Sequence, residues 1–411
     1  MKQSSNRAVM LGALIASAFA ANQASAQQST PPDEPRPFSE TAARRDGIGL
    51  HRPDLDVALY GLLDLTFVTA NNKNTKGDRE SNFQTPWFSG PRWGIIGRRA
   101  LPDGAPTLIF KLESEFVVET GNMDTPGTLF NRDAWVGFQG NTMGKLTFGR
   151  QNTLARDFSG NYGDPYTSDG QVTYDERGWT NTNNFKQLIF YAASPTSTRW
   201  DRGVVWKKQF GPFMAGVGHQ FQSPGAGNDP VAGQDSHNVS STAGLAWNGG
   251  TFNVSGFLNH SDVNTFTHKS YSLGGNAGVA QTVRVYAGWF HYTAQQPVVG
   301  ERKDNAWTLS ARFAPAGKLD YEAGYAHFHA DNAGRSGSGF ILNPYASTSA
   351  VTATGTGTKG TIYGSVFYHF DRSTEVYLVA DHMKTKDGWA DPRSFGHASQ
   401  NEFGVGIRTR F

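Results

Sequence analysis

The chain has 411 residues, of which 37% are hydrophobic and 13% aromatic, and it contains 48 glycines and no cysteine. Its 37 basic and 35 acidic residues nearly balance, so charge gives no reason to expect a nucleic acid as a partner. The lack of cysteine excludes disulfides, thiolate catalysis and cysteine-based metal sites.

Residues 1–26 have the three-part pattern of a secretory signal peptide. Lys2 and Arg7 form the positive region, residues 8–21 the apolar region, and Ala24-Ser25-Ala26 the cleavage site. The alternative, a single anchoring helix, would need about 20 apolar residues. Cleavage would remove two of the 37 basic residues and no acidic one, which leaves 35 of each sign.

The rest of the chain divides at about residue 56. Residues 27–55 are rich in proline and charge (PPDEPRP, then AARRDG), which predicts a mobile N-terminal extension. From Val57 onward, short segments of alternating polarity are separated by Gly, Asn, Asp and Pro, which predicts strands and no helix of useful length. We therefore assign residues 56–411 to one β-barrel domain.

The last segment of the chain illustrates the alternation. Phe403, Val405 and Ile407 fall on one face, whereas Arg408 and Arg410 fall on the other. Because strand side chains alternate with a period of two, the first set would face lipid and the second a lumen.

Sixteen segments show this strand pattern. They are 57–69, 91–99, 106–118, 130–139, 143–150, 201–210, 213–222, 239–248, 250–260, 267–276, 281–293, 304–314, 318–330, 359–370, 373–384 and 400–411. A further run, 187–193 (QLIFYAA), is either a strand or part of a long loop. We assign it to the loop because bacterial single-chain barrels have even strand numbers.

The connections alternate in length along the chain. Short turns such as Gly211-Pro212 alternate with longer loops, and this alternation is typical of a transmembrane barrel. The longer loops are expected near 70–90, 119–129, 223–238, 294–303, 331–358 and 385–399. The predicted fold class is therefore all-β, a transmembrane antiparallel barrel of 16 strands. The alternative, a β-sandwich, would need two apolar faces that enclose a core.

Five motifs stand out along the chain: Leu59-Tyr60-Gly61-Leu62-Leu63-Asp64, Gly90-Pro91-Arg92-Trp93-Gly94, Asn131-Arg132-Asp133-Ala134-Trp135-Val136-Gly137-Phe138, Gly144-Lys145-Leu146-Thr147-Phe148-Gly149-Arg150-Gln151 and the terminal Val405-Gly406-Ile407-Arg408-Thr409-Arg410-Phe411. Together they resemble the motifs of one family, the general diffusion porins of Gram-negative outer membranes. The motifs occur in the family's order, and the resemblance covers residue 56 to the C-terminus.

The resemblance implies a trimeric outer-membrane channel for ions and small hydrophilic solutes, with its third loop folded into the pore. It also implies that Phe411 is part of the sequence that the barrel-assembly machinery recognises, and that the partners are outer-membrane lipid and lipopolysaccharide. The family narrows its pore between wall arginines and acidic residues of the third loop, and such rings of charge set selectivity in pores.

Matched residue by residue, the resemblance implies that Arg92, Arg132 and Arg199 are the basic residues of the constriction. Further basic residues expected in the lumen are Arg150, Arg202, Arg408 and Arg410. The opposing acids are expected from the pore loop, as Asp157, Asp164, Asp169, Asp175 and Glu176. An arginine wall of this kind would favour anions.

Other sites and functions are less well supported by the residues. His327 and His329 would share one strand face, but no third ligand is evident, so we expect no metal and no cofactor. An outer-membrane barrel enzyme would need a nucleophile and a histidine at a spacing that the chain does not single out. A substrate-specific channel is the other alternative, since the Gly- and Thr-rich loop at 331–358 could contact a solute.

Overall fold

The structure, a computed structural model, describes residues 48–84, 87–163, 170–176, 198–221, 239–263, 266–296, 299–336, 339–340, 353–371, 373–389 and 391–411. The predicted signal peptide, the first part of the predicted extension and the run 187–193 lie outside these residues. None of the described helices is long and apolar enough to cross a membrane.

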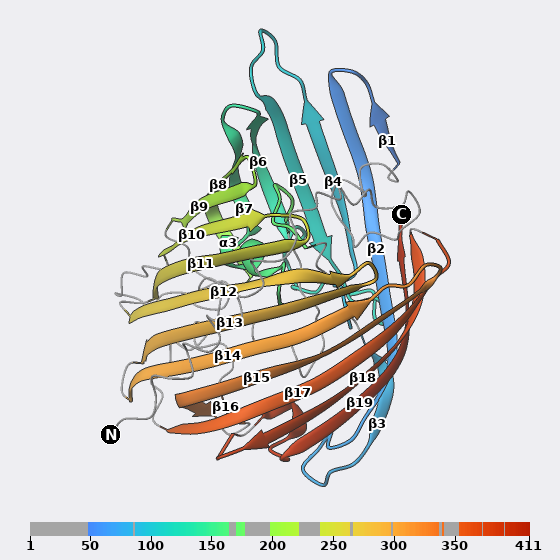
Figure 1. The fold of residues 1–411 in the computed structure, drawn as a ribbon, viewed down its shortest axis with the longest axis vertical. Coiled ribbons are helices and arrows are strands. Elements are labelled where there is room, and N and C mark those ends of the chain that lie inside the picture. Colours follow the sequence, from blue (N-terminus) through green and yellow to red (C-terminus); the bar gives the residue numbers. More distant parts are fainter. Residues whose placement is uncertain are drawn as a thin grey trace. The chain divides into compact units, whose positions relative to one another are not determined.

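The described residues form nineteen strands, one short α-helix and one 3₁₀ turn (Figure 1). The strands are β1 (Ile48–His51), β2 (Leu55–Ala70), β3 (Glu80–Gln84), β4 (Arg92–Arg99), β5 (Thr107–Glu115), β6 (Asp133–Gly140), β7 (Gly144–Asn152), β8 (Arg199–Phe210), β9 (Phe213–Gln220), β10 (Val239–Asn248), β11 (Phe252–Val263), β12 (Phe266–Ala280), β13 (Val283–Gln296), β14 (Gly300–Phe313), β15 (Leu319–Ser336), β16 (Gly339–Phe340), β17 (Thr354–His369), β18 (Thr374–Lys386) and β19 (Ser399–Arg410). The helix is α3 (Leu154–Ser159), and the 3₁₀ turn is η3 (Pro392–Ser394).

All of these strands except β1, β3 and β16 form one closed antiparallel barrel of sixteen strands, which confirms the predicted fold class. Each barrel strand pairs with the next along the chain, and β19 returns to pair with β2 from Glu402 opposite Ala70 to Arg410 opposite Leu62. The backbone of Phe411 extends this pairing by two hydrogen bonds to Gly61, of 2.9 and 3.1 Å. Every barrel strand therefore has a neighbour on both sides, as a membrane requires of a sheet.

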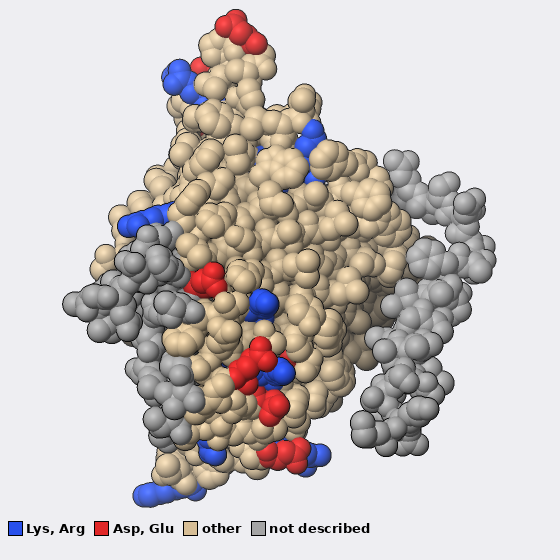
Figure 2. All heavy atoms as spheres, turned by 90° about the vertical axis from the view of Figure 1, so that its left-hand side faces the viewer, with Lys and Arg blue, Asp and Glu red and all other residues tan. Residues whose placement is uncertain are grey.

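The polarity of the barrel is the reverse of that of a soluble protein. Along β19, Val405 and Ile407 are about half exposed, at 47% and 49%, whereas Glu402 and Arg408 are 2% exposed. Most other wall strands repeat this pattern, with large apolar side chains outside and Ser, Thr, Asn or charged side chains inside. Figure 2 shows one face of the molecule, on which charged residues form only small separate groups. An apolar exterior around a polar interior is the arrangement of a membrane-embedded barrel.

The strand ends differ from the predicted limits in one consistent way. β13 continues to Gln296 and β14 begins at Gly300, so the predicted long loop at 294–303 is wrong and only residues 297–299 connect the two strands. β15 and β17 likewise extend into the predicted loop at 331–358. In these extensions both faces carry polar residues, and the alternation of polarity that reveals a strand is therefore lost.

The predicted N-terminal extension also ends earlier than expected. Residues 48–51 form β1, which pairs with β2 from Ile48 opposite Leu59 to His51 opposite Asp56. The backbone of β2 continues beyond the point where Phe411 ends the neighbouring strand, and β1 covers the edge that this leaves. A strand edge with free N–H and C=O groups is readily paired by any available segment.

The two histidines considered for a metal site lie on β15. His327 has the outward parity and stacks on Trp307, with ring centroids 5.6 Å apart, and His329 shares that parity. Tyr325 also stacks on His327, so the contacts on this face are aromatic. Stacked rings of this kind are typical of a barrel's interfacial belt.

The connection between β18 and β19 is fastened to the inner wall. The ammonium of Lys359 in β17 lies 2.8 Å from the carboxylate of Asp391, and both side chains are almost fully buried. Trp389 packs edge-on against Phe328 of β15, with ring centroids 5.0 Å apart. Burial alone would raise the pKa of Asp391, but the charge and hydrogen bond of Lys359 outweigh burial and lower the pKa to about 2.

We expect Lys359→Met to destabilise the barrel by about 3–5 kcal/mol, because it leaves Asp391 buried without its cation. Chemical unfolding of the refolded protein would measure this cost. The wild type should lose about 2 kcal/mol as the pH falls from about 4 to about 2, since Asp391 then takes up a proton that it resists in the folded state. The variant should not show this loss. The exposed Lys384→Met is the control, and equal destabilisation by both variants would contradict the interpretation.

Candidate functional site

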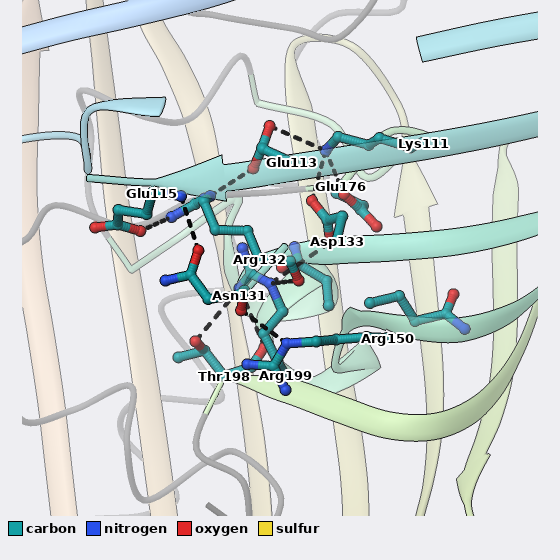
Figure 3. Close-up of polar contacts among 12 residues, drawn as sticks. Lys111, Glu113, Glu115, Asn131, Arg132, Asp133, Arg150, Glu176, Thr198 and Arg199 are labelled. Carbon is teal, nitrogen blue, oxygen red and sulfur yellow. Dashed lines mark hydrogen bonds and ion pairs between the residues drawn. The ribbon is translucent and has the colours of Figure 1, made fainter. Parts of the chain in front are cut away.

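A cluster of charged side chains lies on the inward face of the wall and comes from β4, β5, the start of β6 and β8 (Figure 3). In β5, Lys111, Glu113 and Glu115 share one parity, opposite Leu112. The β5–β6 register sets Glu113 directly opposite Asp133. Alternation within one strand and pairing with the next thus bring four charged groups together on one surface.

Glu113 is the common acceptor of this cluster. Its carboxylate accepts hydrogen bonds from Arg132 Nε at 2.5 Å and from the hydroxyl of Tyr60 at 2.6 Å. Lys111 Nζ lies 3.4 Å away and Arg92 Nη1 3.8 Å away. Because the side chain of Glu113 is only 1% exposed, these cations and donors replace the water that an ionised carboxylate requires.

Arg132 joins the two glutamates of β5. It lies just before β6, and Figure 3 shows its guanidinium directed toward both Glu113 and Glu115, each of which it contacts. Its own carbonyl accepts a hydrogen bond of 2.9 Å from Arg199 Nε, which also lies 3.5 Å from Asp133. The cluster is therefore a network of both signs, in which each of these arginines has a carboxylate close by.

The connection between β7 and β8 begins with α3, a helix that was not expected from the sequence. Thr153 precedes the helix, and its hydroxyl accepts a hydrogen bond from the backbone N–H of Arg156, as an N-cap does. The helix has only six residues, which are fewer than two turns. A helical period of 3.6 residues cannot be recognised in so short a segment.

α3 and the residues after it pack closely on the inward face of β9 to β13. Phe158 lies over Gly244, where a Cβ would approach its ring to 2.6 Å, and Tyr162 lies in the same way over Gly274 and Gly288. The Tyr162 hydroxyl is 2.6 Å from Ser272 Oγ. Glycine at these strand positions leaves the space that the aromatic rings occupy.

Polar contacts hold the same segment to the wall. Lys207 of β8 donates a 2.9 Å hydrogen bond to Asp157, which also accepts from Asn152 at 2.9 Å. Further along, Asn276 of β12 donates to the carbonyl of Asn161 at 2.7 Å. Segment 153–176, in its described part, is therefore fastened by both apolar and charged contacts.

This segment also adds one residue of each sign to the charged cluster. Glu176 accepts a 2.8 Å hydrogen bond from Lys111. Arg156 lies close to the arginines of the wall: burial lowers the pKa of its guanidinium, and the charges of Arg199, Arg132 and Arg92 lower it further. A guanidinium nevertheless stays charged at any physiological pH, so Arg156 adds positive charge to the cluster.

The structure brings the three predicted constriction arginines together, and each has a carboxylate of the wall close by. Their carboxylates come from β5 and β6 of the wall. The predicted pore-loop acids Asp157 and Glu176 bind the lysines Lys207 and Lys111. The carbonyl of Asp175 accepts a hydrogen bond from Lys207. Asp164 and Asp169 lie outside the described residues.

The four arginines expected in the lumen have different environments. Arg408 is buried on the inward face, paired with Glu375, and Arg410 shares its parity. Arg150 pairs with Asp201 and donates to the backbone carbonyl of residue 131, next to the cluster. Arg202 instead is exposed, with a positive φ of 51° at a backbone irregularity of β8, and the structure does not place it with the other three.

Three cations of this region were missed from the sequence. Lys111 could have been found, because it lies between Phe110 and Leu112 in its strand and so has inward parity. Lys207 lies between Trp206 and Lys208, so the alternation does not single it out. No pattern in the sequence distinguishes Arg156, since its position depends on how the segment after β7 lies against the wall.

Known proteins share the sequence pattern and the fold of this chain. The family model of the Gram-negative porins matches residues 12–388. An outer membrane porin protein of Bordetella pertussis is 28% identical over 276 residues, which are 59% of this chain and 67% of that protein.

Solved structures of outer-membrane proteins are also similar to it. An anion-selective porin from Comamonas acidovorans has a TM-score of 0.65 at 18% identity, covering 87% of this chain and 100% of that one. The outer membrane protein OmpT of Vibrio cholerae, in its trimer form, has a TM-score of 0.58 at 15% identity, covering 87% of this chain and 100% of that one. At these identities the solved structures show a shared fold.

We expect Glu113→Gln to destabilise the protein by about 3–5 kcal/mol, because it leaves Lys111, Arg92 and Arg132 without their common carboxylate. The exposed Glu119→Gln makes the same chemical change and should cost less than about 0.5 kcal/mol. Chemical unfolding of both variants in the same detergent or vesicles gives the comparison. A Glu113→Gln variant as stable as the control would show that the cluster does not depend on this carboxylate.

Proposed function

Because the chain belongs to the Gram-negative porin family, a family of outer-membrane channels, we propose that it is a general diffusion pore. Ions and small hydrophilic solutes would cross it passively through the lumen. The observation that carries this proposal is the polar inward face of the barrel, where short uncharged side chains such as Ser310, Thr361 and Ser365 predominate over β10 to β17. Such a surface offers hydrogen bonds to water and to many solutes but is selective for none.

The narrowest part of this pore would lie beside the charged cluster, at the level where segment 153–176 lies on the inward face of the strands. The contacts of α3 with β9 to β12, and the hydrogen bond of Ser255 to the carbonyl of Phe158, support this location on the inward side of the strands. The fastening by Lys207, Ser255 and Asn276 would keep the opening constant in width.

The field at this narrow part would favour anions weakly. The described cluster contains five cations, Arg92, Lys111, Arg132, Arg156 and Arg199, and four carboxylates, Glu113, Glu115, Asp133 and Glu176. An excess of one positive charge gives a preference far smaller than an arginine wall without these acids would give. The preference would also decrease with salt, because screening shortens the range of the charges.

A homotrimer is the assembly that we propose. OmpT of Vibrio cholerae, which shares the fold, has been solved in a trimer form. In a bilayer, a trimeric pore should give current steps in units of three.

The first test is single-channel recording of the refolded protein in a planar bilayer. We expect steady, ohmic conductance, because a water-filled lumen held by fixed contacts has one open state. We expect the current steps in units of three, because the three pores of a trimer insert together. The heat-denatured protein is the control. A protein that inserts without conducting would contradict the proposed channel, and single independent steps would contradict the trimer.

The second test measures selectivity with two opposite charge changes. Arg156→Gln should shift the reversal potential in a salt gradient toward cations, whereas Glu176→Gln should shift it toward anions. One charge about 8 Å from a passing ion is worth about 0.5 kcal/mol in water-like surroundings, so each change should alter the permeability ratio about twofold. Shifts in the same direction, or none, would contradict the assignment of the narrow part.

A further inference from the structure

The pairing of β2 with its neighbour is interrupted in the middle of the barrel wall. β3 pairs with β2 as far as Gln84 opposite Thr66, and β4 resumes from Arg92 opposite Leu62. Residues 63–65 of β2 therefore face seven residues of the returning chain, 85–91, of which 87–91 are described. Since a continuous strand would place only three residues there, the returning chain leaves the plane of the wall.

Residues 87 and 88 lie on the inward side of this wall. Trp87 and Phe88 are 2% and 1% exposed and belong to an apolar cluster with residues of β2, β17 and β18. The Phe88 ring centroid is 4.9 Å from that of Tyr377 and 5.0 Å from that of Phe367. Both partners have inward parity in their strands, so the segment lies inside the ring of strands.

Asp64 holds the segment in this position. One oxygen of its carboxylate accepts the backbone N–H groups of Ser89 at 2.8 Å and of Phe88 at 3.2 Å. The other accepts the hydroxyl of Tyr377. Arg408, opposite Asp64 in the register, donates a 3.1 Å hydrogen bond to Ser89 Oγ. One buried carboxylate thus supplies acceptors that the bulged backbone cannot find in the ladder.

The far end of the segment touches the charged cluster. Arg92 Nε donates a 2.8 Å hydrogen bond to the carbonyl of Gly90. Gly90 also lies so close to the carboxylate of Glu115 that any Cβ at this position would overlap it. The position of residues 87–91 therefore determines where one arginine and one glutamate of the cluster lie.

We propose that residues 87–91 are a second inward constriction element, which narrows the pore from the side of β2, β17, β18 and β19. Asp64 is its positioning residue, and through Gly90 the element sets Arg92 and Glu115 of the charged cluster. The proposal rests on the proposed function in one respect, because it takes the lumen as the path of the solutes.

The first experiment compares Asp64→Ala with a control of equal charge change. Asp64→Ala removes the acceptor of both N–H groups, so residues 87–91 should detach from the inner surface of the wall. The open-state current should then become noisier, and the mean conductance should change by about 1.5-fold or more. The control is Glu322→Gln, which also removes one inward negative charge and whose described hydrogen bond is to Ser365 of β17. Unchanged conductance and noise in Asp64→Ala would overturn the proposal. Asp64→Leu, which is close to Asp in size but has no acceptor, replaces it if the alanine variant does not assemble.

The second experiment does not depend on conduction. The chain has no cysteine, so Ser89→Cys provides a single thiol of nearly unchanged size within the segment. A charged methanethiosulfonate reagent should modify it about tenfold faster when Asp64→Ala is also present, because loss of two hydrogen bonds favours the open segment. Combination with Glu322→Gln should leave the rate unchanged.

The two experiments fail in different ways. A wild-type barrel that does not conduct would contradict the proposed function, and the thiol rates would still test the position of the segment. If the barrel conducts but Asp64→Ala changes neither the thiol modification rate nor the current, the proposed channel function stands and the second constriction element is overturned.

Discussion

The structure depends on one constraint: in lipid, each backbone N–H and C=O group must find its partner within the protein. The sixteen strands meet it by closing β19 onto β2, and the backbone of Phe411 completes the closure against Gly61. Where β2 extends beyond this point, β1 pairs with its edge, and where the β2 ladder is interrupted, the Asp64 carboxylate accepts two N–H groups. These irregular features of the wall are thus solutions to the same requirement.

Closure also creates the interior in which the proposed function resides. The outward face is occupied by apolar side chains, and polar residues are therefore concentrated in the lumen. Segments that leave the wall can fold only against this inner surface or into the solvent beyond the strands. Three segments fold against the inner surface: α3, residues 87–91 and the pair Trp389 and Asp391. At each of them a buried acid pairs with a wall cation or with backbone N–H groups.

The charged cluster shows why the net charge of a site does not follow from counting its arginines. Arg92, Arg132 and Arg199 lie together, yet Glu113, Glu115 and Asp133 come from the same wall and offset most of their charge. A buried charge without a partner is costly, so close packing of arginines requires close packing of carboxylates. The net charge of the cluster is the small difference between the two sets, and Arg156 and Glu176 of segment 153–176 each change that difference by one charge.

The number of barrel strands and the inward parity of residues such as Arg408 could be predicted from the sequence alone, because a period of two is a local property that each strand displays by itself. It did not reveal strand extensions with polar residues on both faces, as in β13 and β14, since the contrast between the faces disappears there. Three features became visible in the folded barrel alone: which carboxylate lies beside each arginine, where Arg156 lies, and the inward position of residues 87–91. These features depend on the register between strands and on packing within the closed barrel, and neither leaves a periodic trace in the chain.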